Sequence, residues 1–322
     1  MLRLDRFAAA ASLALAACTP ISEPARVASP PPVVAPASIE YTDLTDDFAA
    51  VWERTRAMDD AARVAALRAH FQPLIPGFYD REQAGPFKYA DLIVRALNAF
   101  PENRAGIEQV SRNFAAMAVP ARTSFEAAFG PMGEMPPIIL LHSLGEMDGG
   151  VRTMKATGRT LLFGADMIAN IHLEHGIQPF FHHELFHVFH ERTFKGCDAL
   201  WCGLWSEGLA VYVAERLNPG ATDAQLLLVE PVPLRAAVEV NRKAALCTVL
   251  ARLTSTSSAD HAALFSGGKI SDDLPSRAGY YIGYLVAADI GKTHSLPQLA
   301  AMPAGQVRPL VEASLRRMAD CS

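Results

Sequence analysis

One helix constrains what this chain can fold into. Residues 179–196 read P-F-F-H-H-E-L-F-H-V-F-H-E-R-T-F-K-G, and neither proline nor glycine interrupts the run between its two ends. A proline in the first turn and a basic residue followed by glycine at the end are typical helix boundaries. Leu185, Phe186, Val188 and Phe189 give such a helix an apolar surface to bury. The sequence therefore predicts a helix over residues 179–195.

The same segment gathers histidines. Of the ten histidines in the chain, six fall within the 19 residues from 172 to 190. His183 and His187 are four residues apart, so on a helix they lie on one face about a turn apart. Two imidazoles at this H-E-x-x-H spacing can bind one Zn²⁺, and Glu184 between them can reach a water molecule on that metal. His183 and His187 are therefore candidate zinc ligands, and Glu184 is a candidate general base.

A catalytic zinc needs a third protein ligand and an open position. The long metzincin pattern places a histidine six residues after the second ligand, but Thr193 stands there. Glu207 lies 20 residues after His187 and opens a second expected helix in the context W-S-E-G-L-A. A carboxylate would complete a His₂Glu set and leave a net positive metal centre. Glu207 is therefore the candidate third ligand.

At these residues the chain resembles the gluzincins, the metallopeptidases of the H-E-x-x-H…E type such as thermolysin and the membrane alanyl aminopeptidases. It is most similar to small predicted zinc-dependent proteases that carry H-E-x-x-H, E-G-L-A and a later G-Y-x-x-G-Y, which here is Gly279 to Tyr284. The resemblance covers about residues 137–320 and implies a zincin-like catalytic core. One residue departs from thermolysin: Val211 stands where that enzyme has an Asp that orients a ligating histidine.

The resemblance also suggests how a substrate would be held. It implies that residues 160–164 form the edge strand on which a peptide substrate pairs. A tetrahedral oxyanion needs a donor besides the metal. Tyr280 is the candidate, with Tyr284 one helical turn on, and a core tyrosine with a satisfied hydroxyl is the alternative for either. The four remaining histidines of the cluster are expected on the surface or beside the site, since His₂Glu needs no fourth protein ligand: His172, His175, His182 and His190.

The N-terminus resembles an export signal. A short basic start precedes an apolar run over residues 7–17, which is too short to span a bilayer and fits a secretory signal. Leu15-Ala16-Ala17-Cys18 resembles the lipobox of bacterial lipoproteins, which implies a signal peptide over residues 1–17, lipidation of Cys18 and outer-membrane anchoring toward the periplasm. Residues 18–40 are rich in proline and predict an extended tether. A plain signal peptide with an incidental cysteine is the alternative.

Cysteine usage agrees with export. Four cysteines remain after Cys18, an even number in an oxidising compartment. Proximity favours the pair Cys197–Cys202, which leaves Cys247–Cys321, and buried free thiols are the alternative.

The rest of the chain predicts a mainly α fold with a small central β-sheet. Residues 41–322 are expected to form one zincin-like unit, with a helical N-terminal half over 41–130 whose helices are punctuated by prolines, and a catalytic part over 131–322. Residues 137–142 and 160–164 predict strands, and the Gly-rich residues 143–158 predict a loop or hairpin. Further helices are expected at about 205–217, 233–254, 278–292 and 304–320.

These features together predict a lipid-anchored zinc metallopeptidase that acts on peptide or protein substrates. The net charge of −5 offers no basic excess to hold nucleic acid. Two alternatives remain: a zinc amidase acting on a non-peptide or cell-wall amide, and a non-catalytic zinc-binding scaffold lipoprotein. The sequence leaves the oligomeric state open.

Overall fold

The computed structural model describes residues 39–84, 87–272 and 274–321. The expected signal peptide and Cys18 lie outside these residues, as does nearly all of the expected tether. Residues Pro36–Ser322 cluster as one compact unit. The unit is mainly helical with a small sheet, so the predicted fold class is confirmed. No described helix is both long and apolar enough to cross a membrane.

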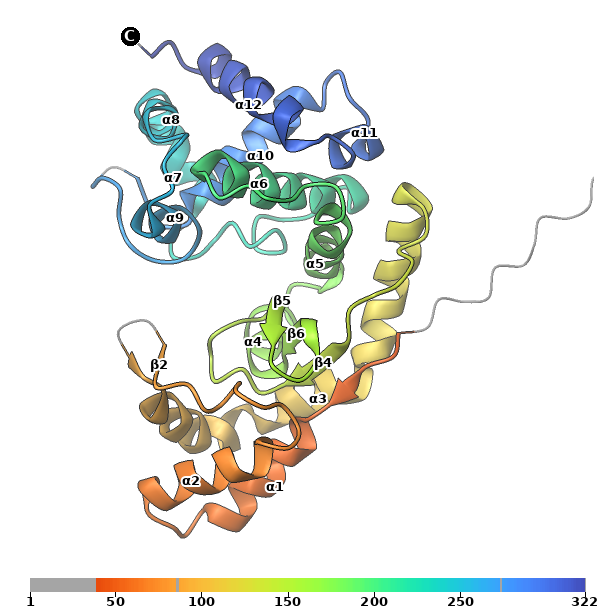
Figure 1. Ribbon diagram of the computed structural model, residues 1–322, viewed down its shortest axis with the longest axis vertical. Helices are drawn as coiled ribbons and strands as arrows, with labels where there is room; N and C mark the ends of the chain where they lie inside the picture. Colours follow the sequence, from red (N-terminus) through yellow and green to blue (C-terminus); the bar gives the residue numbers. More distant parts are fainter. Residues whose placement is uncertain (1–38, 85–86, 273, 322) are drawn as a thin grey trace, which may run out of the picture. The chain divides into compact units, whose positions relative to one another are not determined.

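Twelve helices make up most of the described residues (Figure 1). Their bounds are α1 Thr45–Thr55, α2 Asp60–Phe71, α3 Tyr89–Phe129, α4 Ala165–Ile171, α5 Gln178–His190, α6 Leu200–Leu217, α7 Leu234–Val240, α8 Arg242–Ala251, α9 Ser258–Phe265, α10 Ala278–Ile290, α11 Leu296–Ala300 and α12 Ala304–Met318. The predicted helix over 233–254 is two helices, because Asn241 leaves the helical region with φ −125° and ψ 42°.

The long helix α3 was not predicted. Pro101 and Pro120 were expected to end helices, but α3 runs through both of them. Each proline removes one backbone hydrogen bond. Buried side chains on both sides of each proline, such as Phe100, Phe114 and Phe125, hold the helix against the core and outweigh that loss. In Figure 1, α3 passes from α1 and α2 to the helices around α5, and it packs on α4 and α5.

The main sheet has four strands in the order β1-β4-β6-β5. The strands are β1 Thr42–Asp43, β4 Ile138–Leu141, β5 Gly149–Met154 and β6 Gly158–Gly164, and a separate pair joins β2 Gln83–Ala84 to β3 Phe87–Lys88. All four residues of β4 are buried, as expected for a short apolar run inside a sheet. β4 and β6 are parallel, whereas β5 and β6 form an antiparallel hairpin.

The expected edge strand is wrong. β6, which contains residues 160–164, lies between β4 and β5, so its backbone is already paired on both sides. The Gly-rich residues 143–158 were expected to form a loop or a hairpin, and they contribute to a hairpin. Its first strand, β5, is the edge strand of the sheet. Among the described residues, β5 pairs with β6 alone. The other side of β5 therefore has no strand partner and is open for pairing.

Two disulfides lie in the C-terminal half of the chain. Cys197 pairs with Cys202 and Cys247 pairs with Cys321, which confirms both expected pairings. The first, with a sequence separation of 5, joins the segment before α6 to the first turn of α6, and the second has a sequence separation of 74 and joins Cys321 to α8. The short loop joins the two helices that carry the candidate ligands.

Breaking the long disulfide should destabilise the chain more than breaking the short one. Loop-closure entropy gives about 4 kcal/mol for a loop of this length and about 2 kcal/mol for the short loop. Urea unfolding of the double variants Cys247→Ser/Cys321→Ser and Cys197→Ser/Cys202→Ser measures the two free energies. Equal losses would contradict the expectation, and reductant should no longer act through the deleted bond.

Candidate metal centre

Helix α5 supplies two imidazoles to one point. Phe181, Leu185, Phe186 and Val188 are all at most 3% exposed, so most of the helix surface is fixed in the core. His183 and His187 occupy the remaining face. Their rings meet at a centroid distance of 4.6 Å, and their Nε2 atoms lie 3.0 Å apart. The i, i+4 spacing therefore brings the two nitrogens together as the sequence predicted.

Helix α6 brings the third group. Glu207 Oε2 lies 3.4 Å from His183 Nε2 and 3.2 Å from His187 Nε2. These three side chains form the one group among the described residues whose ligand atoms lie close enough together to hold a metal ion. Val211, on the same helix, is buried and apolar and offers no hydrogen bond to a ligand.

The spacing of these three atoms fits a tetrahedral metal. Two donors that each lie about 2.1 Å from one zinc ion are about 3.4 Å from each other. The observed separations of 3.0, 3.2 and 3.4 Å agree with that geometry. Two imidazoles and one carboxylate are also a donor set that zinc accepts in catalytic sites. The residues present therefore fit Zn²⁺ without rearrangement of the backbone.

The electrostatics of the three groups favour positive charge. Burial opposes ionisation of Glu207, but the neighbouring His187 and His183 outweigh it and hold the pKa of that carboxyl well below its usual range. Burial also opposes the imidazolium of His187, yet the Glu207 carboxylate raises its pKa to about 9. Burial and the charge of His187 lower the pKa of His183. The Glu207 carboxylate thus stabilises a positive charge placed next to it by the two imidazoles.

Glu184 faces the same space without a partner. Its Oε2 is buried and has no hydrogen-bond partner among the described residues. Burial, with the charges of Asp148 and Glu207, raises the pKa of Glu184 to about 8. A Cβ at Gly149 would lie 2.9 Å from Glu184 Cγ, so only glycine lets β5 approach this carboxyl so closely. An unpaired buried oxygen beside the ligands is suited to accept a proton from a molecule bound there.

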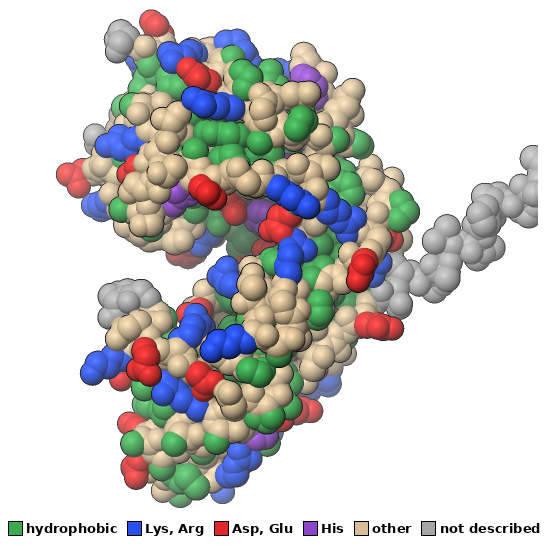
Figure 2. Space-filling view, viewed as in Figure 1, with side chains coloured by type: hydrophobic (Ala, Val, Ile, Leu, Met, Phe, Trp, Pro, Cys, Tyr) green, Lys and Arg blue, Asp and Glu red, His purple; other side chains and the backbone are tan. Residues whose placement is uncertain are grey.

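The site lies in an open cleft of about 570 Å³. One wall carries the three ligands, and the other is the segment from Glu146 to Arg152 that leads into and includes part of β5. Figure 2 shows this face of the unit hollowed, with Lys and Arg side chains along the lower wall of the hollow. An edge strand and the candidate metal centre therefore face one cavity.

Tyr280 lies in this cleft and Tyr284 does not. The Tyr280 ring is 6.2 Å from the His183 ring, and Tyr280 lines the cavity. Burial, together with the Glu207 charge, raises its pKa well above 10, so its hydroxyl keeps its proton as a donor. Tyr284 instead donates to Glu215 Oε2 at 2.8 Å. Of the two tyrosines, only Tyr280 lines the cleft that holds the three convergent groups.

Several cleft residues were missed by sequence reasoning. Arg277 stacks on Tyr280 at 5.0 Å, with its backbone at φ +66°, and its Nε is buried without a partner among the described residues. Asp148 accepts a hydrogen bond from Gly149 N, and Arg152 projects from β5. These residues carry no spacing signal, because the fold brings them to the site from separate segments.

The other histidines of the cluster lie outside the three-atom group. His182 bonds Asn218 and the carbonyl of Ala121, and so ties α5 to α6 and α3. His172 is fully buried and pairs with Asp148 Oδ2 at 2.9 Å. His190 stacks between two phenylalanines, and His175 is exposed. Their placement agrees with the expected supporting or surface roles.

Comparison of this chain with protein-family models, with curated proteins and with solved structures gave no match.

Proposed function

We propose that this chain is a zinc-dependent peptidase that is anchored outside the cytoplasm through lipid on Cys18. One observation carries the proposal. His183 Nε2, His187 Nε2 and Glu207 Oε2 converge with tetrahedral spacing on one wall of an open cleft, and the unpaired carboxylate oxygen of Glu184 lies beside them. A metal held only for structure would sit in a closed four-ligand site.

The chain's own groups suit amide hydrolysis. A zinc ion in such a site polarises a carbonyl and lowers the pKa of bound water. Glu184 accepts a proton at its unpaired Oε2 and returns it to the leaving amine. Its pKa of about 8, raised by burial, is close to neutral pH, where a group can both take and give a proton.

The open side of β5 supports an extended peptide as the substrate. A peptide that adds to a sheet edge gains main-chain hydrogen bonds without any requirement on its sequence. Gly149 and Gly150 line the cleft beside the candidate ligands, so this part of β5 borders the space where a substrate would bind. This strand favours a peptide over an amide that cannot adopt an extended chain.

Metal content and cleavage test the proposal together. The protein purified without chelator should carry one zinc per chain and should cleave members of a peptide library, and removal of zinc should abolish cleavage. Absence of stoichiometric zinc would overturn the metal centre. Zinc without cleavage of any peptide, but with cleavage of a cell-wall amide, would replace the peptidase by an amidase.

Replacing Tyr280 by phenylalanine should lower the rate of cleavage about 10²-fold, which is the lower end of the loss when one oxyanion donor is removed. Zinc content should not change, because Tyr280 is not one of the convergent ligands. Tyr284→Phe is the matched control: it removes the same atom one turn along α10, where the hydroxyl binds Glu215. Equal effects of the two variants on turnover would reject the role of Tyr280.

The two disulfides support an oxidising compartment. Metabolic labelling with palmitate tests the anchor: the wild type should be labelled and should fractionate with membranes, and Cys18→Ser should do neither. If the wild-type protein is not labelled, Cys18 is not lipidated, and the N-terminus is a plain signal peptide instead.

A further inference from the structure

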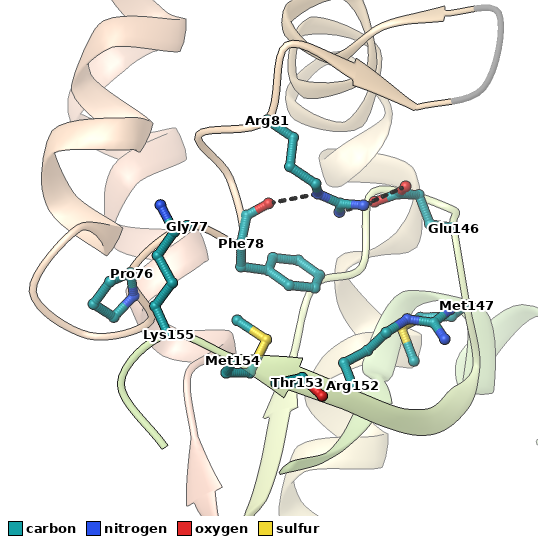
Figure 3. Close-up of a pocket in the computed structure, with 10 residues that line it drawn as sticks. All are labelled: Pro76, Gly77, Phe78, Arg81, Glu146, Met147, Arg152, Thr153, Met154 and Lys155. Atoms are coloured by element: carbon teal, nitrogen blue, oxygen red, sulfur yellow. Dashed lines mark hydrogen bonds and ion pairs between the residues drawn. The ribbon is translucent and has the colours of Figure 1, made fainter. Parts of the chain in front are cut away.

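A second cavity adjoins the metal cleft. It measures about 280 Å³ and lies between residues 76–81, which precede β2, and residues 146–155, which include β5 (Figure 3). We call it the Phe78 pocket. Glu146, Met147 and Arg152 line both cavities, so the pocket continues the cleft along β5. Its volume lies below the ~300–1,000 Å³ of small-molecule sites and suits one side chain of a larger ligand.

The pocket has an apolar floor and a basic rim. Figure 3 shows the Phe78 ring facing Met154 and Met147 across the cavity. The stem of Lys155 runs along Gly77, where a Cβ would lie 3.3 Å from Lys155 Cδ. Neither Lys155 nor Arg152 forms an ion pair with the residues that the structure describes. Two cations therefore border an apolar cavity, and one of them, Arg152, also acts on the charge of Glu184.

The N-terminal half is fastened to this cavity. Arg81 binds both carboxylate oxygens of Glu146, and its guanidinium stacks on Phe78 at 5.1 Å. Tyr89 also donates to Glu146 Oε2 at 2.9 Å, and the buried Tyr79 donates to the carbonyl of His142 at 2.6 Å. Arg81 is neutralised by Glu146, so the positive charge of the rim comes from Arg152 and Lys155. These bonds hold the Phe78 wall at a set distance from β5.

We propose that the Phe78 pocket is a specificity site that takes one bulky apolar side chain of a peptide bound along β5, with an acidic residue next to it. The inference rests on the proposed function, because the occupant is part of the substrate. The floor matches an apolar side chain, and Arg152 and Lys155 match a carboxylate beside it. The helical N-terminal half thereby selects which peptides reach the metal centre.

Peptide binding, measured apart from turnover, tests this site. Zinc-loaded Glu184→Gln protein is titrated with short fluorescein-labelled peptides in which a Phe-Asp pair is moved stepwise through a Gly/Ser background. Matched sets carry Ala-Asp, Phe-Asn or Ala-Asn. Burial of the ring should make the best Phe-Asp peptide bind about 10–100-fold more tightly than its Ala-Asp counterpart. Asp should be preferred over Asn by up to about 5-fold, and salt should weaken this preference.

Two variants assign these preferences to the pocket. Met154 lines the pocket and faces the Phe78 ring (Figure 3), so Met154→Trp should fill the cavity and remove the preference for Phe, whereas Met154→Leu should retain it. Lys155→Glu should remove or reverse the preference for Asp. Arg308→Glu makes the same change of charge at an exposed position of α12 and should alter neither preference.

The outcomes separate this inference from the peptidase proposal. Equal binding of Phe-Asp and Ala-Asp peptides, or a preference for Phe that survives Met154→Trp, would overturn the pocket even if the wild type cleaves peptides. A wild type that holds zinc and binds Phe-Asp peptides selectively, but cleaves none of them, would overturn the peptidase and leave the pocket as a peptide-binding site.

Discussion

Replacement of Glu184 by glutamine is expected to reduce the rate of peptide cleavage by about 10²–10⁴-fold, the usual contribution of a positioned acid–base group. Glutamine keeps the shape of the side chain but cannot accept a proton. Glu184 is not among the three convergent ligand atoms, so zinc content should stay at the wild-type level. Single-turnover kinetics and metal analysis on the same preparation measure both quantities.

Stability gives a second readout for this variant. Glu184 is buried and its Oε2 has no partner, so an amide should be tolerated there at least as well as a carboxylate. Glu184→Gln should therefore unfold at the same urea concentration as the wild type or a higher one. Glu174→Gln, at an exposed position before α5, is the matched control and should leave the rate unchanged. Wild-type turnover by folded, zinc-loaded Glu184→Gln would remove Glu184 from the mechanism.

The sequence predicted the wall of the cleft that carries the three convergent groups, because that wall is encoded locally. His183 and His187 are one helical turn apart, and the helix alone places them on one face. Glu207 follows on the next helix after a short loop, whose end is joined to the first turn of α6 by a disulfide, so its approach to the pair depends on few contacts. These features explain why spacing, together with the resemblance at E-G-L-A, was enough to predict all three groups that converge in the structure.

The opposite wall of the cleft could not be predicted in the same way. β5 reads G-G-V-R-T-M and has no alternation of apolar and polar residues that would identify an edge strand. Its position depends on pairing with β6, and the Phe78 pocket needs residues about 70 positions apart in the chain. Packing against distant parts of the chain also keeps α3 continuous through Pro101 and Pro120, which the sequence pattern indicated as helix ends.

The motifs E-G-L-A and G-Y-x-x-G-Y also have a packing role that spacing did not reveal. Helices α6 and α10 cross where Gly208 faces Gly283. A Cβ at Gly208 would lie 2.0 Å from the carbonyl carbon of Gly283, and a Cβ at Gly283 would lie 2.2 Å from the carbonyl oxygen of Leu204. The two motifs therefore meet in space, and their glycines set how closely the helices bearing Glu207 and Tyr280 approach each other.

Gly208→Ala should consequently damage both the fold and the metal centre. Alanine favours a helix over glycine by about 1 kcal/mol, but here the added methyl meets backbone atoms that no rotamer change can move. To reach an ordinary contact the helices would have to separate by about 1.5 Å. We expect a net loss of about 2 kcal/mol or more in the free energy of unfolding. Zinc affinity should fall at least about tenfold, because Glu207 is displaced from the histidine pair.

Gly305→Ala is the matched control, because it is the same substitution at a position with free space. Gly305 is exposed in the first turn of α12, and a Cβ there would meet no atom within 4 Å. This variant should gain up to about 1 kcal/mol from helix propensity and keep the wild-type zinc affinity. Urea unfolding of the zinc-free proteins and competition with a chelator measure the two effects separately. If Gly208→Ala is as stable as Gly305→Ala and binds zinc equally well, the helix crossing does not position Glu207.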